Sequence, residues 1–237
     1  MLTDVEPHQQ LPYTRWNRDR VFFSAMALLA AVTTFVGFAP TYYLKNAYHT
    51  PALPTLVHLH GMLFTSWIAL LTIQTGLVAG RRTDLHRRLG MAGMVLAAAM
   101  TLIAPMVAIG AVRRGAMPLG FFIVPMSTVI VFPMLVAAAF LLRRNPQQHK
   151  RLILLATVEL LTAAVGRLPM VREWGALGDY GVSDVFVAAL VGYDLIVRRR
   201  LEPATLWGGL FLIASQPLRM AVGGTQAWMT LARWLTA

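Results

Sequence analysis

The chain has 237 residues, of which 57% are hydrophobic and only 13% are charged. Soluble domains carry about 25% charged residues, so this composition excludes an ordinary soluble protein and indicates a membrane protein. There is no cysteine, which excludes disulfides, thiolate catalysis and cysteine-based metal sites. The net charge of +11 does not indicate nucleic-acid binding, because the basic residues stand in short clusters between apolar runs.

The N-terminal region is polar and then turns apolar. We expect residues 1–20, which carry three arginines, to form a cytoplasmic tail. The apolar segment 21–39 is longer than the core of a secretory signal, about 7–15 residues, so it indicates an uncleaved membrane helix. Tyr42, Tyr43 and Tyr48 follow, as aromatic residues do at a lipid–water boundary.

Six more apolar segments follow, and all but one have about the 20 residues that a helix needs to cross the hydrocarbon core. They lie at residues 56–79, 89–110, 119–142, 152–169, 183–197 and 204–222. The sequence therefore predicts an all-α polytopic membrane protein, with a bundle of seven transmembrane helices over residues 21–222. The segment 183–197 is the shortest, so we expect that its helix either is thinly covered or begins a few residues earlier.

The orientation follows from the lysines and arginines, most of which lie in the N-terminal region and in alternate loops. Cytoplasmic loops retain such residues, so the N-terminus is predicted to be cytoplasmic and the C-terminus to lie outside. Residues 223–237 are then expected to form an outer interfacial tail. A helix there would place Trp228, Leu231 and Leu235 on one face.

Two of the predicted cytoplasmic turns have similar sequences. Residues 81–89 read RRTDLHRRL and residues 143–152 read RRNPQQHKRL. Thr83 or Asp84 in the first turn and Asn145 in the second are expected to cap the helix that follows. The similarity indicates either an internal duplication, as in some transporters, or simply the basic residues that collect at any cytoplasmic helix start.

The basic residues of these turns are candidate contacts for the head groups of anionic phospholipids. The candidates are Arg81, Arg82, Arg87, Arg88, Lys150 and Arg151. We therefore expect the lipid bilayer as the first partner, with a homo-oligomer or a membrane complex as further partners, and no nucleic acid.

The segment 56–79 carries polar residues on two stripes. His60, Trp67 and Gln74 recur every seven residues on one stripe, whereas His58 lies on a nearly opposite one. The two histidines are therefore expected to contact different neighbours. Each either hydrogen-bonds within the membrane domain or binds a metal together with a residue of another helix.

Glu159 is the least expected residue, because it lies near the middle of segment 152–169. A carboxylate there costs several kcal/mol unless it is paired or protonated. No lysine or arginine lies within one helical turn of it, so we expect an acid that is protonated or shares a proton with a hydrogen-bonding neighbour. Its role is either proton-linked function or a hydrogen bond that holds two helices together.

Four further residues complete the predicted intramembrane polar site near the outer boundary: Arg167, Asp184, Gln216 and Arg219. Asp184 is expected at a helix N-terminus, where a negative charge is favourable. Asp194 stands four residues before Arg198, which predicts a salt bridge at the membrane boundary. The polar residues form either an outward-facing site or side chains that snorkel to the interface.

Several stretches resemble those of a group of bacterial multi-pass inner-membrane proteins. The stretches are APTYYL, HLHGMLFTSWIALLTIQTGL, DLHRRLG, HKRLILLAT, ATLWGGL and SQPLRMAVGG. The resemblance runs from about Phe22 to Trp234 and implies a bacterial inner membrane and seven helices, without an activity. The histidines and basic residues at helix ends loosely resemble those of haem-handling and oxidase-assembly membrane proteins.

Three functions agree with these features. The lack of a catalytic constellation favours a non-catalytic subunit, sensor or assembly component with an intramembrane polar site. The second is a membrane redox component that binds haem b or a metal ion through His58, His60, His86 or His149, the last two being one pair of axial ligands. The third is a small proton-linked transporter that uses Glu159.

Overall fold

The computed structural model describes residues 11–237, and for residues 11–16 it describes the helical backbone alone. The first ten residues of the predicted cytoplasmic tail therefore lie outside the described residues. The described residues are 82% helical and include no strand, which confirms the all-α prediction.

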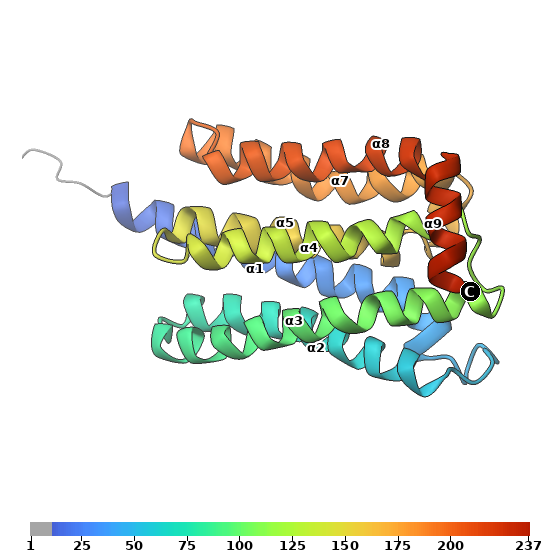
Figure 1. Cartoon of the computed structure of the whole chain (residues 1–237). Coiled ribbons are helices and arrows are strands. Elements are labelled where there is room, and N and C mark those ends of the chain that lie inside the picture. Colours follow the sequence, from blue (N-terminus) through green and yellow to red (C-terminus); the bar gives the residue numbers. More distant parts are fainter. Residues whose placement is uncertain (1–10) are drawn as a thin grey trace, which may run out of the picture.

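The long helices run side by side, and α9 lies across one end of the bundle (Figure 1). The elements, in which η marks a π-helical turn, are α1 (Leu11–Phe38), η1 (Ala39–Tyr43), α2 (Thr55–Ala79), α3 (Thr83–Arg113), α4 (Ile123–Leu141), α5 (Pro146–Val165), α6 (Pro169–Arg172), α7 (Gly175–Tyr193), η2 (Asp194–Arg198), η3 (Ala204–Gly208), α8 (Gly209–Gly223) and α9 (Gln226–Thr236).

Five helical stretches of the described chain are long and apolar enough to cross a membrane, which fits an integral membrane protein. They are Asn17–Tyr43, Thr55–Ala79, Thr83–Arg113, Ile123–Leu141 and Gly175–Arg198. The helices α5 and α8 do not belong to this set. The first carries three charged residues, and the second has 15 residues.

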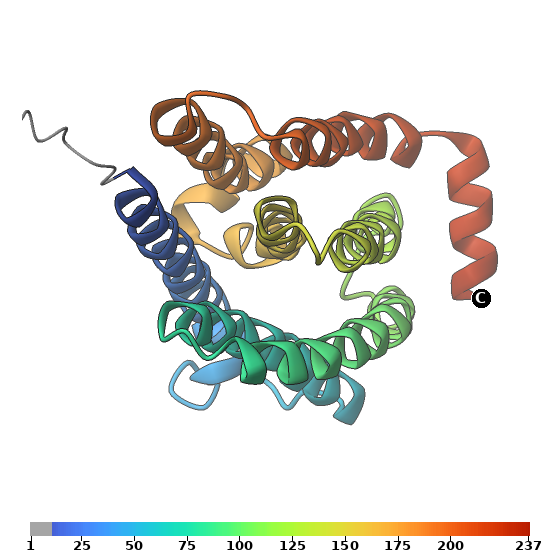
Figure 2. The same ribbon diagram turned by 90° about the vertical axis from the view of Figure 1, so that its left-hand side faces the viewer.

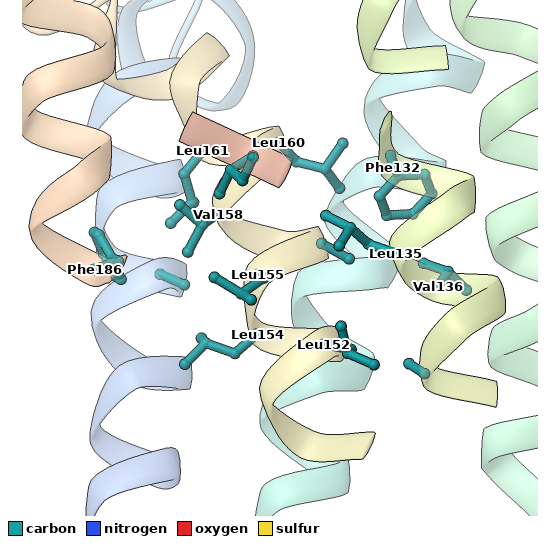
Figure 3. Close-up of a cluster of buried hydrophobic side chains, with 14 of the residues drawn as sticks. Phe132, Leu135, Val136, Leu152, Leu154, Leu155, Val158, Leu160, Leu161 and Phe186 are labelled. Atoms are coloured by element: carbon teal, nitrogen blue, oxygen red, sulfur yellow. The ribbon is translucent and has the colours of Figure 1, made fainter. Parts of the chain in front are cut away.

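The helix α5 lies at the centre of the bundle. In the view along the bundle, α4 and α5 lie between a row formed by α1, α2 and α3 and a second row formed by α7 and α8 (Figure 2). Its main packing partners are α4, α1 and α7. Apolar side chains such as Leu155, Val158 and Leu161 fill the space between these helices (Figure 3).

Different segments of the chain lie at the two ends of the bundle. The start of α1 lies at the same end as the turns 80–82, 142–145 and 199–203, which we call the N-end (Figure 1). The loop 44–54 and α9 lie at the opposite end, which we call the C-end. The basic turns that the sequence assigns to one side of the membrane thus share one end of the molecule.

The helix α5 begins earlier than predicted, and α3 lacks the predicted N-terminal cap. The side chain of Asn145 accepts hydrogen bonds from the backbone N–H groups of Gln147 and Gln148, and Pro146 takes the first helical position, so α5 begins before residue 152. Neither Thr83 nor Asp84 caps α3, because the capping position is Arg82, which makes no such bond.

Two further helices differ from expectation in their details. The helix predicted for 183–197 begins at Gly175 and reaches Arg198 through η2. In α9, Trp228 is buried, whereas Leu231 is 47% exposed, so the predicted apolar face is only partly covered. The buried side of α9 packs on Phe122 and thereby covers the C-end of the bundle.

Candidate functional site

Charged side chains surround the central helix α5 near the N-end. Six of them form what we call the N-end cluster: Asp19, Lys150, Arg151, Asp194, Arg198 and Glu202. They come from α1, α5, η2 and the 199–203 turn, so the cluster joins segments that are far apart in the sequence.

Arg151 and Asp194 form the most buried pair of this cluster, with both side chains 0% exposed. The Nε atom of Arg151 lies 3.1 and 3.2 Å from the two carboxylate oxygens of Asp194. The same carboxylate accepts hydrogen bonds from the backbone N–H of Glu202 and the hydroxyl of Thr205. These donors compensate a charge that burial would otherwise make costly.

Asp19 links α1 to α5 and α7. Its carboxylate accepts hydrogen bonds from Lys150 Nζ at 2.6 Å, from Gln147 Nε2 at 3.1 Å and from the hydroxyl of Tyr193. Arg198 lies 4.0 Å from the same carboxylate. Because the donors come from two other helices, Asp19 fixes the position of α1 on the bundle.

Glu202 is buried in the turn that precedes η3. It accepts hydrogen bonds from Arg198 Nη2 at 2.9 Å, from Arg200 Nε at 3.3 Å and from Gln148 Nε2 at 2.9 Å. Burial opposes the ionised form, but the hydrogen bonds from Arg198 and the charges of Arg198, Arg151 and Arg200 outweigh it. The pKa of the Glu202 carboxyl is therefore lowered.

Three predictions for these residues are corrected. Asp194 pairs with Arg151 rather than with Arg198. Arg198 pairs with Glu202 instead. The complete burial of Arg151 prevents the contact with lipid head groups that was predicted for it, whereas Lys150 binds Asp19 and its predicted lipid contact stays a prediction. Arg81, Arg82, Arg87 and Arg88 are exposed, and their predicted lipid contacts stay a prediction.

A second polar site, which we call the C-end site, joins α4, α5 and α8. Glu159 Oε2 lies 2.8 Å from Arg219 Nη2, and both residues are 3% exposed. The hydroxyl of Thr128 donates to Glu159 Oε1 at 2.6 Å. Ser215 Oγ lies 2.7 Å from Arg219 Nη2, and the ring of Tyr180 on α7 lies 5.9 Å from the guanidinium carbon.

The expectation that Glu159 is protonated stays a prediction, but its premise is corrected by this pair. It relied on the absence of a cation one turn away on the same helix, whereas the cation comes from α8. The residue also lies six positions before the end of α5 at Val165, so it is nearer to the C-end than the predicted segment indicates.

The remaining predicted residues near the C-end are divided between two places. Asp184 lies inside α7, nine residues after Gly175, and accepts a hydrogen bond from Gln216 Nε2 at 2.8 Å. The interpretation as a helix-start charge is therefore wrong. The guanidinium of Arg167 lies 4.4 Å from the ring centroid of Phe38 and donates to the carbonyl of Ala163.

The polar residues of α2 have different neighbours. Trp67 Nε1 donates to Thr157 Oγ1 at 3.1 Å, which links α2 to α5. The side-chain amide of Gln74 donates to the carbonyl of His86 at 3.1 Å. The ring of His58 lies beside Tyr42 and that of His60 beside Phe64, so the two imidazoles have different neighbours.

His86 and His149, which begin α3 and α5, lie close together. Their ring centroids are 6.3 Å apart and their planes are nearly perpendicular. His149 Nδ1 lies 2.9 Å from the carbonyl of Ala139. Among the described residues, no three His, Asp or Glu side chains are near enough to hold a metal ion together.

An apolar layer separates the N-end cluster from the C-end site. Arg151 and Glu159 are eight residues apart on α5, which is about 12 Å along a helix. Leu152, Leu155 and Val158 lie between them and pack on α4 and α7 (Figure 3). The two charged sites therefore do not form one continuous polar path along α5.

Comparison of the chain with protein-family models, with curated proteins and with solved structures gives no match.

Proposed function

We propose that this chain is a seven-helix protein of the bacterial inner membrane that works as a small proton-linked transporter. Glu159 is the proton-carrying group, and Arg219 holds it between proton transfers. The salt bridge between these two residues carries the proposal, because it joins α5 and α8 inside the helical domain. Ionisable residues inside membrane domains commonly belong to proton or substrate pathways.

Seven crossings are supported by the course of α5 and α8. Both run alongside the five apolar helices, and their charged residues pair with other helices rather than face lipid (Figure 1). A helix with such inward polar groups can cross the bilayer although its composition is less apolar. The basic turns at the N-end favour a cytoplasmic location for that end.

A salt bridge of this kind is poorly explained by stability alone. Replacing a buried ion pair with apolar residues is often neutral or stabilising, whereas removing one partner is strongly destabilising. The pair is therefore suited to a switch. Protonation of Glu159 cancels its charge and leaves Arg219 without that ionised partner, and the polar contacts that the described residues offer the two come from Thr128, Ser215 and Tyr180.

The apolar layer favours a carrier over a channel. Because the described residues form no continuous polar path along α5, protons cannot cross there without a rearrangement. A movement of α8 against α4 and α5, released when Glu159 is protonated, exposes the C-end site to one side and then the other. A sensor would use the same switch but expose the site to one side only.

The absence of native cysteine allows a direct test. A single Ser215→Cys variant is reconstituted in oriented vesicles, and a membrane-impermeant thiol reagent is added to either face. Because only the thiolate reacts, each rate is divided by that of an exposed cysteine, as in Arg144→Cys, at the same pH; we expect a low relative rate at neutral pH and a higher one at acidic pH. Adding Glu159→Gln should give the higher relative rate at neutral pH, whereas the control Asp184→Asn should not.

The outcomes separate the hypotheses. Labelling of the Ser215→Cys variant from both faces of the membrane, from each face at a different pH, supports a carrier. Labelling from one face only supports the sensor or subunit that the sequence alone favoured. If Glu159→Gln leaves labelling unchanged at every pH, Glu159 is a structural residue and the proton-linked proposal is wrong.

A second candidate, a haem- or metal-binding redox component, is favoured by the approach of His86 to His149. A carbonyl oxygen only accepts, so His149 Nδ1 is the donor to Ala139, and the Nε2 atom of the neutral ring keeps a lone pair for a metal. The absorbance spectrum and metal content of the purified protein test this candidate. Loss of the signal in His86→Ala, with retention in His58→Ala, would support it.

A further inference from the structure

Two adjoining cavities lie beside η3, where α4, α5 and the 199–203 turn meet. The first has a volume of about 360 Å³ and includes Asn145, Arg200 and Glu202 in its lining. The second has about 320 Å³ and is lined mainly by apolar side chains. Gln148 and Pro203 line both cavities, so the two are parts of one groove.

The first cavity is suited to an anion. The side chain of Arg200 is 70% exposed, and its Nε atom donates to Glu202. Within the described part of the chain, its two terminal nitrogens and the amide nitrogen of Asn145 donate no hydrogen bond. Glu202 is already neutralised by Arg198, so the positive charge of Arg200 remains to attract a phosphate.

The second cavity is suited to a hydrocarbon chain. Leu135 and Leu152 lie buried in its lining, whereas Trp207 is 69% exposed at its edge. Gly208 lets η3 approach α5 closely, since a Cβ there would lie 2.8 Å from a methyl carbon of Leu155. An exposed tryptophan near a helix start is typical of the level of the lipid head groups.

The length of the groove also agrees with the thickness of one lipid leaflet. Phe211, at the deep end of the groove, follows Pro203 by eight residues, which is about 12 Å of helix. The hydrocarbon of one leaflet is about 15 Å thick. The groove thus runs from a basic turn at the membrane boundary into the depth that an acyl chain occupies.

We propose that this groove binds one anionic phospholipid molecule. Its phosphate is held by Arg200 and Asn145, and one acyl chain lies along Trp207 and Phe211. The site differs from the exposed arginines of the α2–α3 turn, because it combines a charged end with an apolar groove. It is independent of the proton-linked proposal, since it involves neither Glu159 nor Arg219.

Fluorescence quenching tests the proposal with the full chain in phosphatidylcholine vesicles. A small share of phosphatidylglycerol with brominated acyl chains is added, because bromine quenches only the tryptophans that it contacts. We expect more quenching than the same share of brominated phosphatidylcholine gives, and Trp207→Phe should remove the excess. Arg200→Gln should weaken the preference for phosphatidylglycerol about fivefold, whereas Arg200→Lys should keep most of it.

Arg144→Gln is the matched control, because Arg144 is exposed in a neighbouring turn and does not line the groove. It should leave the excess quenching unchanged. Equal quenching by the two brominated lipids would overturn the proposal, since the groove would then hold bulk lipid only. An equal loss in Arg144→Gln and Arg200→Gln would overturn it too, since the effect would then be a general one of surface charge.

Discussion

Arg151 and Asp194 pair inside the bundle although they lie 43 residues apart in the chain, and neither side chain is exposed. The guanidinium also donates to the backbone carbonyl and the side-chain oxygen of Gln147, both at 2.8 Å. The pair therefore connects the start of α5 to η2, and further hydrogen bonds from Glu202 and Thr205 and to Gln147 compensate its charges.

We expect Asp194→Leu to destabilise the protein by about 3–5 kcal/mol, because it leaves the buried charge of Arg151 unpaired. The double variant Arg151→Met/Asp194→Leu should regain most of this loss, since apolar residues of similar volume replace a buried pair at little cost. Thermal unfolding in detergent measures both effects. Arg144→Met is the control and should not change the midpoint. A double variant less stable than Asp194→Leu would contradict the interpretation.

The pair Glu159–Arg219 predicts a non-additive result in a double-mutant cycle. Arg219→Met should destabilise the protein, because it leaves the buried carboxylate of Glu159 without a positive charge beside it, although Thr128 still donates a hydrogen bond. Glu159→Gln added to it should restore part of the stability, with a coupling of about 0.5–3 kcal/mol. The midpoints of unfolding of the parent, the two single variants and the double variant give this coupling. Additive effects would mean that the two side chains do not interact.

Glu202 predicts a dependence of stability on pH. Its pKa is lowered in the folded protein from the ordinary value of 4.5, so its contribution is complete above about pH 4.5 and is lost as the pH falls through the lower folded value. Midpoints of unfolding over this acidic range should therefore fall less steeply in Glu202→Gln than in the parent. Asp84→Asn is the control, since Asp84 is exposed and 3.9 Å from Arg82. Identical slopes in all three proteins would contradict the prediction.

The topology is tested by single cysteines in intact cells. Arg82→Cys and Arg144→Cys lie in N-end turns and should be protected from an impermeant reagent, as cytoplasmic positions are. Tyr48→Cys and Glu173→Cys lie at the C-end and should be labelled from outside. A protected cysteine at position 173 would contradict seven crossings with a cytoplasmic N-terminus.

Much of the fold can be predicted from the sequence because apolar segments of membrane length are a strong signal. The predicted helix boundaries are wrong where a helix continues beyond its apolar residues. Asp184 looked like a helix start because the apolar run begins beside it, but the helix continues back through the mixed residues to Gly175. A helix that packs against protein on one side does not need to be apolar there.

Sequence reasoning identifies some residues of the two charged sites but not the pairs that they form. Glu159 stood out because a lone acid in an apolar run is costly, and Arg219 was noted for the same reason. Their pairing was not predicted, because sequence spacing limits contacts on one helix and says nothing about contacts between helices. Asp19 and Glu202 were missed since each lies close to a basic cluster and looked solvated.

The central position of α5 has a consequence for how the chain is made. Arg151 and Glu159 leave the ribosome before Asp194 and Arg219 have been synthesised, so on the proposed seven-helix topology α5 enters the membrane before the partners of these two charges exist. A charge at the centre of a helix disfavours insertion by about 2.5–3.5 kcal/mol, and a charge nearer a helix end, as Arg151 and Glu159 are, disfavours it by less. Asp19 is already present and offers a partner for Lys150 alone. The central helix α5 can therefore complete its ion pairs only after η2 and α8 have been added.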